Sequence, residues 1–383
     1  MLSRNKRILF PVLLISIVIV LGVQPLIAQE DLDPSGLPLL EPGLHLGTTF
    51  YGNAEVPEDD SLTEAVTVAA DSGMDAFNFS VDWAGLEPQP GQYELDELEA
   101  SLMWLDGLGI QPLLNISFID VTELTLPDDL LNEAGDGLID GMVFDDPIML
   151  DRLNSLLDEV VPLLVEHGGF LLLLGNEVDA FFNEVPSVDP EAYARLIDAA
   201  RSHVHVTQPE LAVGVTLTGA EVLDEGDIFQ LLRPATDIIP FNFYPIDWWS
   251  ADWYTVFDLE DISEYIDQFM QIYGNAPVVI QELGCPSAEA NGSSLDYQAQ
   301  CFEVMFEALQ AYPNVRYVTV FTLFDWDEVT CDLIIDWFGL TEDDLPGIYF
   351  DRWRGFLCTL GLLNPDFSPK PAWDVFINTV EGQ

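Results

Sequence analysis

Basic residues are scarce in this sequence. Its 383 residues include 11 lysines and arginines against 67 aspartates and glutamates, which gives a formal net charge of −56. Arg4, Lys6 and Arg7 lie near the N-terminus, and Lys370 is the only later lysine. A chain with so few cations cannot neutralise nucleic-acid phosphates, and anionic membranes or polyanionic substrates would repel it. Nucleic acid is therefore excluded as a partner, and the acidic residues are interpreted as a solvated surface.

Patterns for metals and cofactors are also missing. The four cysteines contain no CxxC pair, which argues against a zinc site or a thioredoxin-like motif. No acidic stretch has the spacing of an EF-hand loop, although calcium elsewhere on the acidic surface stays open. The stretch 47–52 is not a glycine-rich phosphate loop. The sequence therefore gives no motif for a zinc site or a nucleotide cofactor.

The N-terminus has the layout of a secretory signal peptide. The basic residues precede an apolar run over 8–23, and Pro25 and Ala28 follow it. We expect residues 1–28 to be a signal, 29–42 to be a polar, Pro-rich linker, and the protein to be secreted. Because the apolar run is long, an uncleaved membrane anchor is the alternative.

Export would expose the cysteines to oxidising conditions. Four cysteines allow three pairings. We predict Cys285–Cys301 and Cys331–Cys358, because each pair closes a loop within one segment of the chain.

Strand-like and helix-like segments alternate from residue 43 onward, with a period of about 35–45 residues. Several strands are near-continuous apolar runs, as in parallel sheets covered on both faces. The pattern predicts a single-domain α/β fold, a (β/α)₈ TIM barrel over 43–383, with an open doubly wound sheet as the alternative. The expected strands are 44–51, 76–83, 111–118, 168–177, 211–218, 237–244, 277–283 and 316–326. The expected helices are 61–74, 94–108, 147–166, 190–203, 227–232, 262–273, 294–311 and, after a long loop, 371–380.

Two of the expected strands end in a glutamate. The apolar run 170–174 is followed by Gly175, Asn176 and Glu177, and the run 277–280 by Gln281 and Glu282. Strand packing does not require these carboxyls, and burying one costs several kcal/mol unless it is paired or faces a pocket. Active sites of barrels lie at the C-terminal ends of the strands, so both glutamates are expected at the same rim.

Asn176-Glu177 ending strand four, with Glu282 ending strand seven, resembles the retaining glycoside hydrolases of clan A. This is the large superfamily of cellulase-, mannanase- and β-galactosidase-type enzymes. The likeness covers nearly all of the chain after the signal. Shorter motifs that add to it are Phe79-Ser80-Val81-Asp82-Trp83, Leu86-Glu87-Pro88, Tyr244-Pro245, Trp326, Gly361-Leu362 and Pro369-Lys370-Pro371-Ala372-Trp373.

The resemblance implies that Glu177 is the general acid/base and Glu282 the nucleophile of a retaining β-glycosidase. Such enzymes hold two carboxyls about 5–5.5 Å apart, one protonated and one ionised. Like charges at that distance raise one of the two pKa values, which supplies the protonated partner. The implied substrate is a β-linked polysaccharide or oligosaccharide, and the implied reaction needs no cofactor. No protein partner is predicted, and the sugar, the linkage and endo or exo action stay open.

The resemblance also implies sugar-binding roles. Asn176 would bond the 2-hydroxyl, Tyr244 would donate to the nucleophile, and Trp326 would form the floor under the sugar. Trp248 and Trp249 belong to an aromatic loop that is interpreted as a sugar-stacking platform, or else as a small core under a long loop. His45, on the first strand, either lines the pocket or is a core histidine.

One position departs from the family. Its members carry an arginine in strand two, where this chain has Asn78. A neutral amide stabilises an ionised Glu282 less than a guanidinium does, and Arg352 or Arg354 are candidate substitutes. The departure favours an alternative function, a non-catalytic carbohydrate-binding barrel. A metal-dependent barrel hydrolase is a third hypothesis, against which the lack of clustered histidines weighs.

Overall fold

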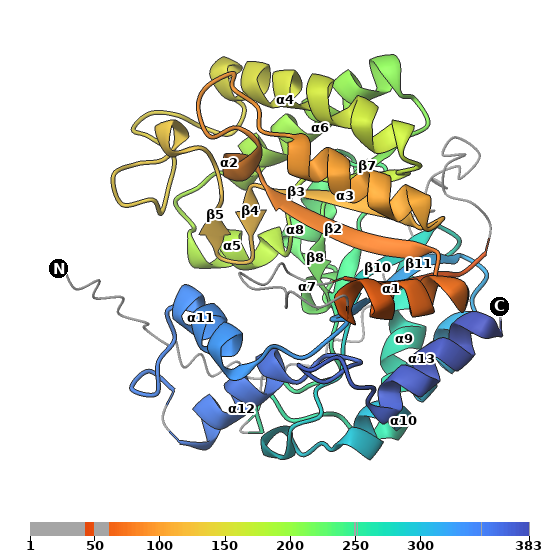
Figure 1. Ribbon diagram of the computed structural model, residues 1–383. Coiled ribbons are helices and arrows are strands. Elements are labelled where there is room, and N and C mark those ends of the chain that lie inside the picture. Colours follow the sequence, from red (N-terminus) through yellow and green to blue (C-terminus); the bar gives the residue numbers. More distant parts are fainter. Residues whose placement is uncertain (1–42, 50–60, 249, 251, 346, 383) are drawn as a thin grey trace, which may run out of the picture. The chain divides into compact units, whose positions relative to one another are not determined.

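The computed structural model describes residues 43–49, 61–248, 250, 252–345 and 347–382 (Figure 1). The expected signal and linker, the end of the first strand and Trp249 lie outside the described residues.

A parallel sheet forms the centre of the fold. Its order is β7-β6-β3-β2-β1-β11-β10-β9-β8. β7 and β8 are two parts of the expected fifth strand, and they pair with β6 and β9 respectively. The two ends of the sheet therefore belong to one strand, and the sheet closes into the predicted (β/α)₈ barrel. The strands are β1 His45–Thr49, β2 Ala76–Asp82, β3 Gln111–Ser117, β6 Leu171–Leu173, β7 Ala212–Gly214, β8 Leu217–Thr218, β9 Phe241–Phe243, β10 Val278–Leu283 and β11 Val315–Phe321.

Helices surround the sheet where they were expected (Figure 1). Their starts follow from local chemistry: the Asp146 carboxyl accepts from the Ile148 N–H, and Pro147 occupies the first turn of α4. No helix in the described part of the chain is both long and apolar enough to cross a membrane. The helices that surround the sheet are α1 Ser61–Asp71, α3 Asp96–Gly107, α4 Pro147–Glu166, α6 Pro190–Thr207, α8 Asp227–Leu232, α9 Leu259–Tyr273, α10 Leu295–Gln310 and α13 Pro371–Glu381.

Further short elements lie in the connections, where the sequence predicted loops. They are α2 Trp83–Leu86, α5 Val178–Glu184, α7 Gly219–Leu223, the hairpin β4 Ile119–Asp120 with β5 Glu123–Leu124, and the 3₁₀ turns Asp128–Leu130 and Glu289–Asn291. The expectation of a long loop after strand eight was wrong, because that segment folds into α11 Glu328–Phe338 and α12 Ile348–Cys358.

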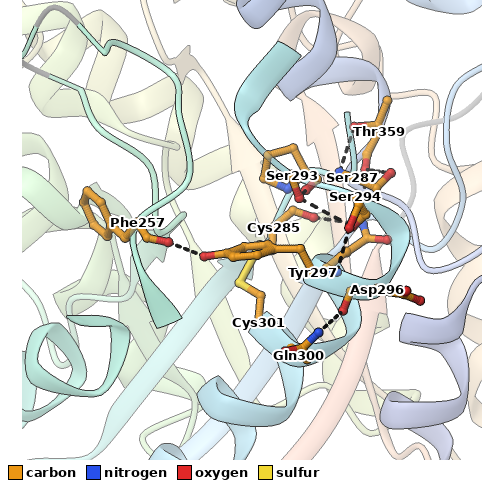
Figure 2. Close-up of a disulfide and its surroundings, with 12 residues drawn as sticks. Phe257, Cys285, Ser287, Ser293, Ser294, Asp296, Tyr297, Gln300, Cys301 and Thr359 are labelled. Atoms are coloured by element: carbon orange, nitrogen blue, oxygen red, sulfur yellow. Dashed lines mark hydrogen bonds between the residues drawn. A yellow bond between two sulfur atoms is a disulfide. The ribbon is translucent and has the colours of Figure 1, made fainter. Parts of the chain in front are cut away.

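Both predicted disulfides are confirmed. Cys285–Cys301 joins the segment just after β10 to α10 (Figure 2), and Cys331–Cys358 joins α11 to α12. Next to the first disulfide, the Tyr297 hydroxyl donates to the Phe257 carbonyl. The segment that follows Glu282 is therefore tied to the helix behind it.

The acidic excess predicts a salt-dependent stability. With 67 acidic residues against 11 basic ones, most carboxylates repel one another without a cationic partner. The Debye length falls from about 30 Å at 0.01 M salt to about 3 Å at 1 M, so Tm should rise with NaCl. Differential scanning calorimetry across this range tests the expectation, with sucrose of equal osmolality as the control. A flat or falling Tm would contradict it.

Candidate active site

Glu177 lies where the fourth strand turns into α5. It adopts a left-handed backbone conformation with φ 47° and ψ 42°, which side-chain-bearing residues rarely adopt. The preceding Gly175 has φ +119°, and a Cβ there would lie 2.7 Å from both the Tyr193 hydroxyl and Val178 Cγ1. This tight turn puts Glu177 at the mouth of the barrel, and strained backbone of this kind concentrates at functional sites.

Glu282 lies on β10 and is 5% exposed. The hydroxyl of Tyr244, just after β9, donates to Glu282 Oε2 at 2.6 Å. Glu177, Glu282, Asn176 and Tyr244 all line one cavity of about 430 Å³. The structure thus brings the two glutamates to one cavity at the C-terminal ends of the strands.

The two carboxyls have different surroundings. Burial raises the pKa of both, and for Glu177 the charge of Glu282 raises it further. The Asn242 amide donates to Glu177 Oε1 at 3.0 Å, whereas Glu282 receives the Tyr244 hydroxyl. Two adjacent carboxylates cannot both ionise easily, and the charge of the partner adds to burial at Glu177, so Glu282 loses its proton first and Glu177 keeps its proton to higher pH.

Asn176 connects the two glutamates' strands. Its Oδ1 accepts from Asn242 Nδ2 at 3.2 Å and from Gln281 Nε2 at 3.4 Å, and its Nδ2 donates to Asp120 Oδ1 at 3.0 Å. These bonds fix which way the buried amide faces. Asn176 therefore presents a defined surface to the cavity.

Two further carboxyls line the cavity, and the sequence interpretation missed both as site residues. Asp82 ends β2, and Asp120 lies in the hairpin after β3. Burial raises the pKa of Asp120 to about 6, although its hydrogen bond from Asn176 opposes the shift. Asp82 lies at the end of the expected strand 76–83 and Asp120 follows the expected strand 111–118, so the rule that found the glutamates would have found them. Among the described residues, no group of three or more His, Cys, Asp or Glu side chains is arranged to hold a metal ion.

The expected aromatic residues divide between the cavity and packing. Trp326 lines the cavity and contacts Phe321 edge-on at 6.1 Å between ring centroids. Trp248 also lines it, and packs on Tyr254 at 5.0 Å and Phe356 at 5.7 Å. The aromatic loop is thus a small core that also presents Trp248 to the cavity.

Among the described residues, Asn78, Arg352 and Arg354 make no hydrogen bond to Glu177 or Glu282. Asn78 is buried in β2, and its amide has no hydrogen-bond partner among the described residues. Arg352 donates to the Trp253 carbonyl at 3.3 Å, and Arg354 pairs with Asp332. Both arginines bond other groups than Glu282, so the structure does not support either as a substitute for the strand-two arginine.

His45 lies at the start of β1, the end opposite to the cavity. Its Nδ1 is 2.6 Å from Asp75 Oδ2, and its ring lies 6.1 Å from that of Tyr317. Tyr317 belongs to the apolar cluster that fills the barrel interior. His45 is therefore placed with the core and not with the candidate site.

A second cavity of about 710 Å³ adjoins the first. Glu177, Tyr244, Trp248 and Tyr254 line both. Glu282 lines the first cavity, and Asn242 lines the second. Glu177 therefore stands at the boundary between two spaces, only one of which Glu282 faces.

No protein-family model and no curated protein matches this chain. Solved structures do match. An exo-β-1,4-mannosidase from Opitutaceae bacterium strain TAV5 is 16% identical with a TM-score of 0.64, over 88% of this chain and 59% of its own. A GH5_18 protein from Bifidobacterium longum subsp. longum in complex with Manβ1-4GlcNAc is 15% identical with a TM-score of 0.67, over 89% and 78%. Bacteroides uniformis β-glucuronidase 2 is 16% identical with a TM-score of 0.56, over 89% and 35%.

At such low identity these likenesses establish the fold, a TIM barrel shared with glycoside hydrolase structures. The chain spans 59% of the length of the mannosidase, and 35% of that of the glucuronidase. The shared fold agrees with the resemblance to clan A that the sequence motifs indicated.

Proposed function

We propose that this protein is a retaining β-glycosidase that hydrolyses a β-linked polysaccharide or oligosaccharide by double displacement. Glu282 is the nucleophile and Glu177 the general acid/base. The observation that carries the proposal is the pair of glutamates, Glu177 after β6 and Glu282 in β10, which line one cavity and each accept a hydrogen bond from a neutral donor, Asn242 and Tyr244 respectively. Their carboxyls are expected about 5–5.5 Å apart, the separation that accompanies retention.

In the first step, a Glu282 oxygen attacks the anomeric carbon. Tyr244 donates to Oε2, which leaves the other oxygen for the attack. The bond to the leaving oxygen breaks as Glu177 gives that oxygen its proton. The products are the free leaving group and a glycosyl ester of Glu282.

In the second step, water attacks the same carbon. Glu177, now a carboxylate, takes a proton from the water, and the ester bond breaks to return Glu282 as a carboxylate. Glu177 ends protonated, so the site is restored. Two inversions give overall retention.

The two cavities suggest how the substrate lies. The sugar under attack must contact both glutamates, so it belongs in the first cavity with Trp326 beneath it. The leaving group must contact Glu177, so it extends into the second cavity. A second cavity of about 710 Å³ favours a leaving group larger than a small alcohol.

The charge of the site favours a neutral sugar. Among the described residues that line the two cavities there is no Lys, Arg or His, and the first cavity holds four carboxyls, Asp82, Asp120, Glu177 and Glu282. A uronic acid would bring a further negative charge without a counter-ion. We therefore expect β-glucuronides to be poor substrates, although a structural neighbour is a β-glucuronidase.

The basic–apolar–small pattern of the N-terminus and the two disulfides support a secreted enzyme, with membrane anchoring by an uncleaved segment as the alternative. N-terminal sequencing of the protein from culture medium and from washed membranes separates the two.

The function is tested on a panel of 4-nitrophenyl β-glycosides and β-linked oligosaccharides, with and without a chelator. We expect turnover of at least one neutral β-glycoside, and a first product of β configuration by ¹H NMR before mutarotation. An α-configured first product would contradict retention. Binding of glycans without any turnover would favour the carbohydrate-binding barrel, which the unpartnered Asn78 motivates.

A further inference from the structure

Asp179 lies two residues after Glu177, in the first turn of α5, and is 3% exposed. It has no part in the two chemical steps above. A buried carboxyl this close to the acid/base must be stabilised by other groups, because an unpaired buried charge is costly.

Thr218 supplies that stabilisation from the neighbouring strand. Its backbone N–H donates to Asp179 Oδ1 at 2.9 Å, and its hydroxyl donates to Asp179 Oδ2 at 2.6 Å. The hydroxyl oxygen itself accepts from the Glu221 N–H at 3.2 Å, which directs its hydrogen toward Asp179. Both carboxyl oxygens therefore accept, which favours the ionised form and opposes the rise in the pKa of Asp179 that burial causes.

These two hydrogen bonds join the start of α5, directly after Glu177, to β8. The Val178 N–H donates to the Thr216 carbonyl at 3.4 Å, and Asp179 adds two bonds to Thr218. Glu177 precedes both anchored residues and holds its left-handed conformation between them and Gly175. A strained conformation persists only where its surroundings over-determine it.

We propose that Asp179 is a positioning residue for the acid/base: bonded to Thr218, it fixes the turn that carries Glu177 and places a carboxylate beside it. This inference rests on the proposed function for its catalytic meaning. The other charged or titratable groups facing Glu177 are Glu282, Asp120 and Tyr254, and Glu221 faces Asp179. All of them are acids, so no cation among them cancels the charge of Asp179.

The charge has a definite consequence. A negative neighbour favours the protonated acid, and Asp179 is among the groups that raise the pKa of Glu177. Asp179→Asn should therefore shift the alkaline limb of the kcat/KM profile to lower pH, by roughly half a unit to one unit. The matched control is Asp227→Asn, an exposed acid in the first turn of α8 that lines neither cavity, and it should leave the limb in place.

A second variant covers the case in which Asp179→Asn does not fold. Thr218→Val removes the hydroxyl donor and keeps both charges, whereas Thr218→Ser keeps the donor. We expect Thr218→Val to lose about 10-fold in kcat on poor leaving groups and less on activated ones, with Thr218→Ser close to wild type. Wild-type behaviour of Thr218→Val on both classes would overturn the proposal.

A readout without substrate separates this inference from the proposed function. The ¹³C carboxyl resonance of Glu177, identified by its loss in Glu177→Gln, is titrated in the wild type and in Asp179→Asn. A lower pKa in the variant supports the inference, and an unchanged one overturns it. Absence of any glycosidase turnover in the wild type and in Asp227→Asn would instead defeat the proposed function.

Discussion

Replacing Glu282 by Gln should reduce kcat by roughly 10⁴-fold or more, because no covalent intermediate can form without the carboxylate nucleophile. The amide has the same size and can still accept the bond from Tyr244, which donates to Oε2 in the wild type. The loss is therefore chemical and not a result of collapse of the cavity. Steady-state rates on the best aryl β-glycoside of the panel measure it.

The control is Glu289→Gln, an exposed acid in the 3₁₀ turn Glu289–Asn291 after β10, which should keep wild-type kcat. Full activity in the Glu282 variant would remove the glycosidase proposal altogether. A loss of similar size in Glu289→Gln would mean that the fold of this segment was disturbed, and that the loss in the Glu282 variant was not specific to the nucleophile.

The same variant should be more stable than the wild type at high pH. Burial raises the pKa of Glu282, so the folded state holds a proton that the unfolded chain has lost. Wild-type stability therefore falls as the pH rises from about 4.5 toward the raised pKa, and the glutamine in its place removes this loss. The Tm difference between the two proteins should vanish at low pH and grow as the pH rises.

Strand counting predicted much of this site because parallel barrels have one functional rim. The runs before Glu177 and Glu282 are apolar and bounded, so their ends could be located in the sequence, and the structure brings both ends to one cavity. Asn242 was not predicted as a contact of Glu177, because it sits inside an apolar strand, Phe241–Phe243, where an amide has no distinguishing pattern.

The helices after strand eight could not be predicted for a different reason. On α11, Val329, Leu333 and Trp337 are exposed, while Cys331 and Ile335 are buried, so apolar residues occupy both faces. Helix prediction depends on a contrast between a polar and an apolar face, and α11 lacks that contrast. His45 shows a second limit of prediction from the sequence. Histidine is a residue type that can line a pocket, but His45 lies at the start of β1, whereas the cavity lies at the other end of the strands.

Replacing Glu177 by Ala should slow the enzyme by an amount that depends on the leaving group. General acid catalysis contributes about 10²- to 10⁴-fold, and only leaving oxygens that need a proton benefit from it. Oligosaccharides and alkyl β-glycosides should therefore lose that full factor at the glycosylation step. 2,4-Dinitrophenyl β-glycosides, whose leaving group departs as an anion, should lose much less there. Pre-steady-state bursts and the slope of log kcat/KM against leaving-group pKa measure the difference.

Azide tests the role of Glu177 in the second step. The glycosyl ester on Glu282 forms from an activated substrate, but without Glu177 no base removes the proton from water. Azide needs no base, so it should attack the anomeric carbon of the glycosyl ester. This attack releases the Glu282 carboxylate and gives a β-glycosyl azide. Azide with Glu282→Gly should give the α anomer instead, since one displacement inverts the centre. If Glu177→Ala lost the same factor on every leaving group and azide restored nothing, Glu177 would not be the acid/base.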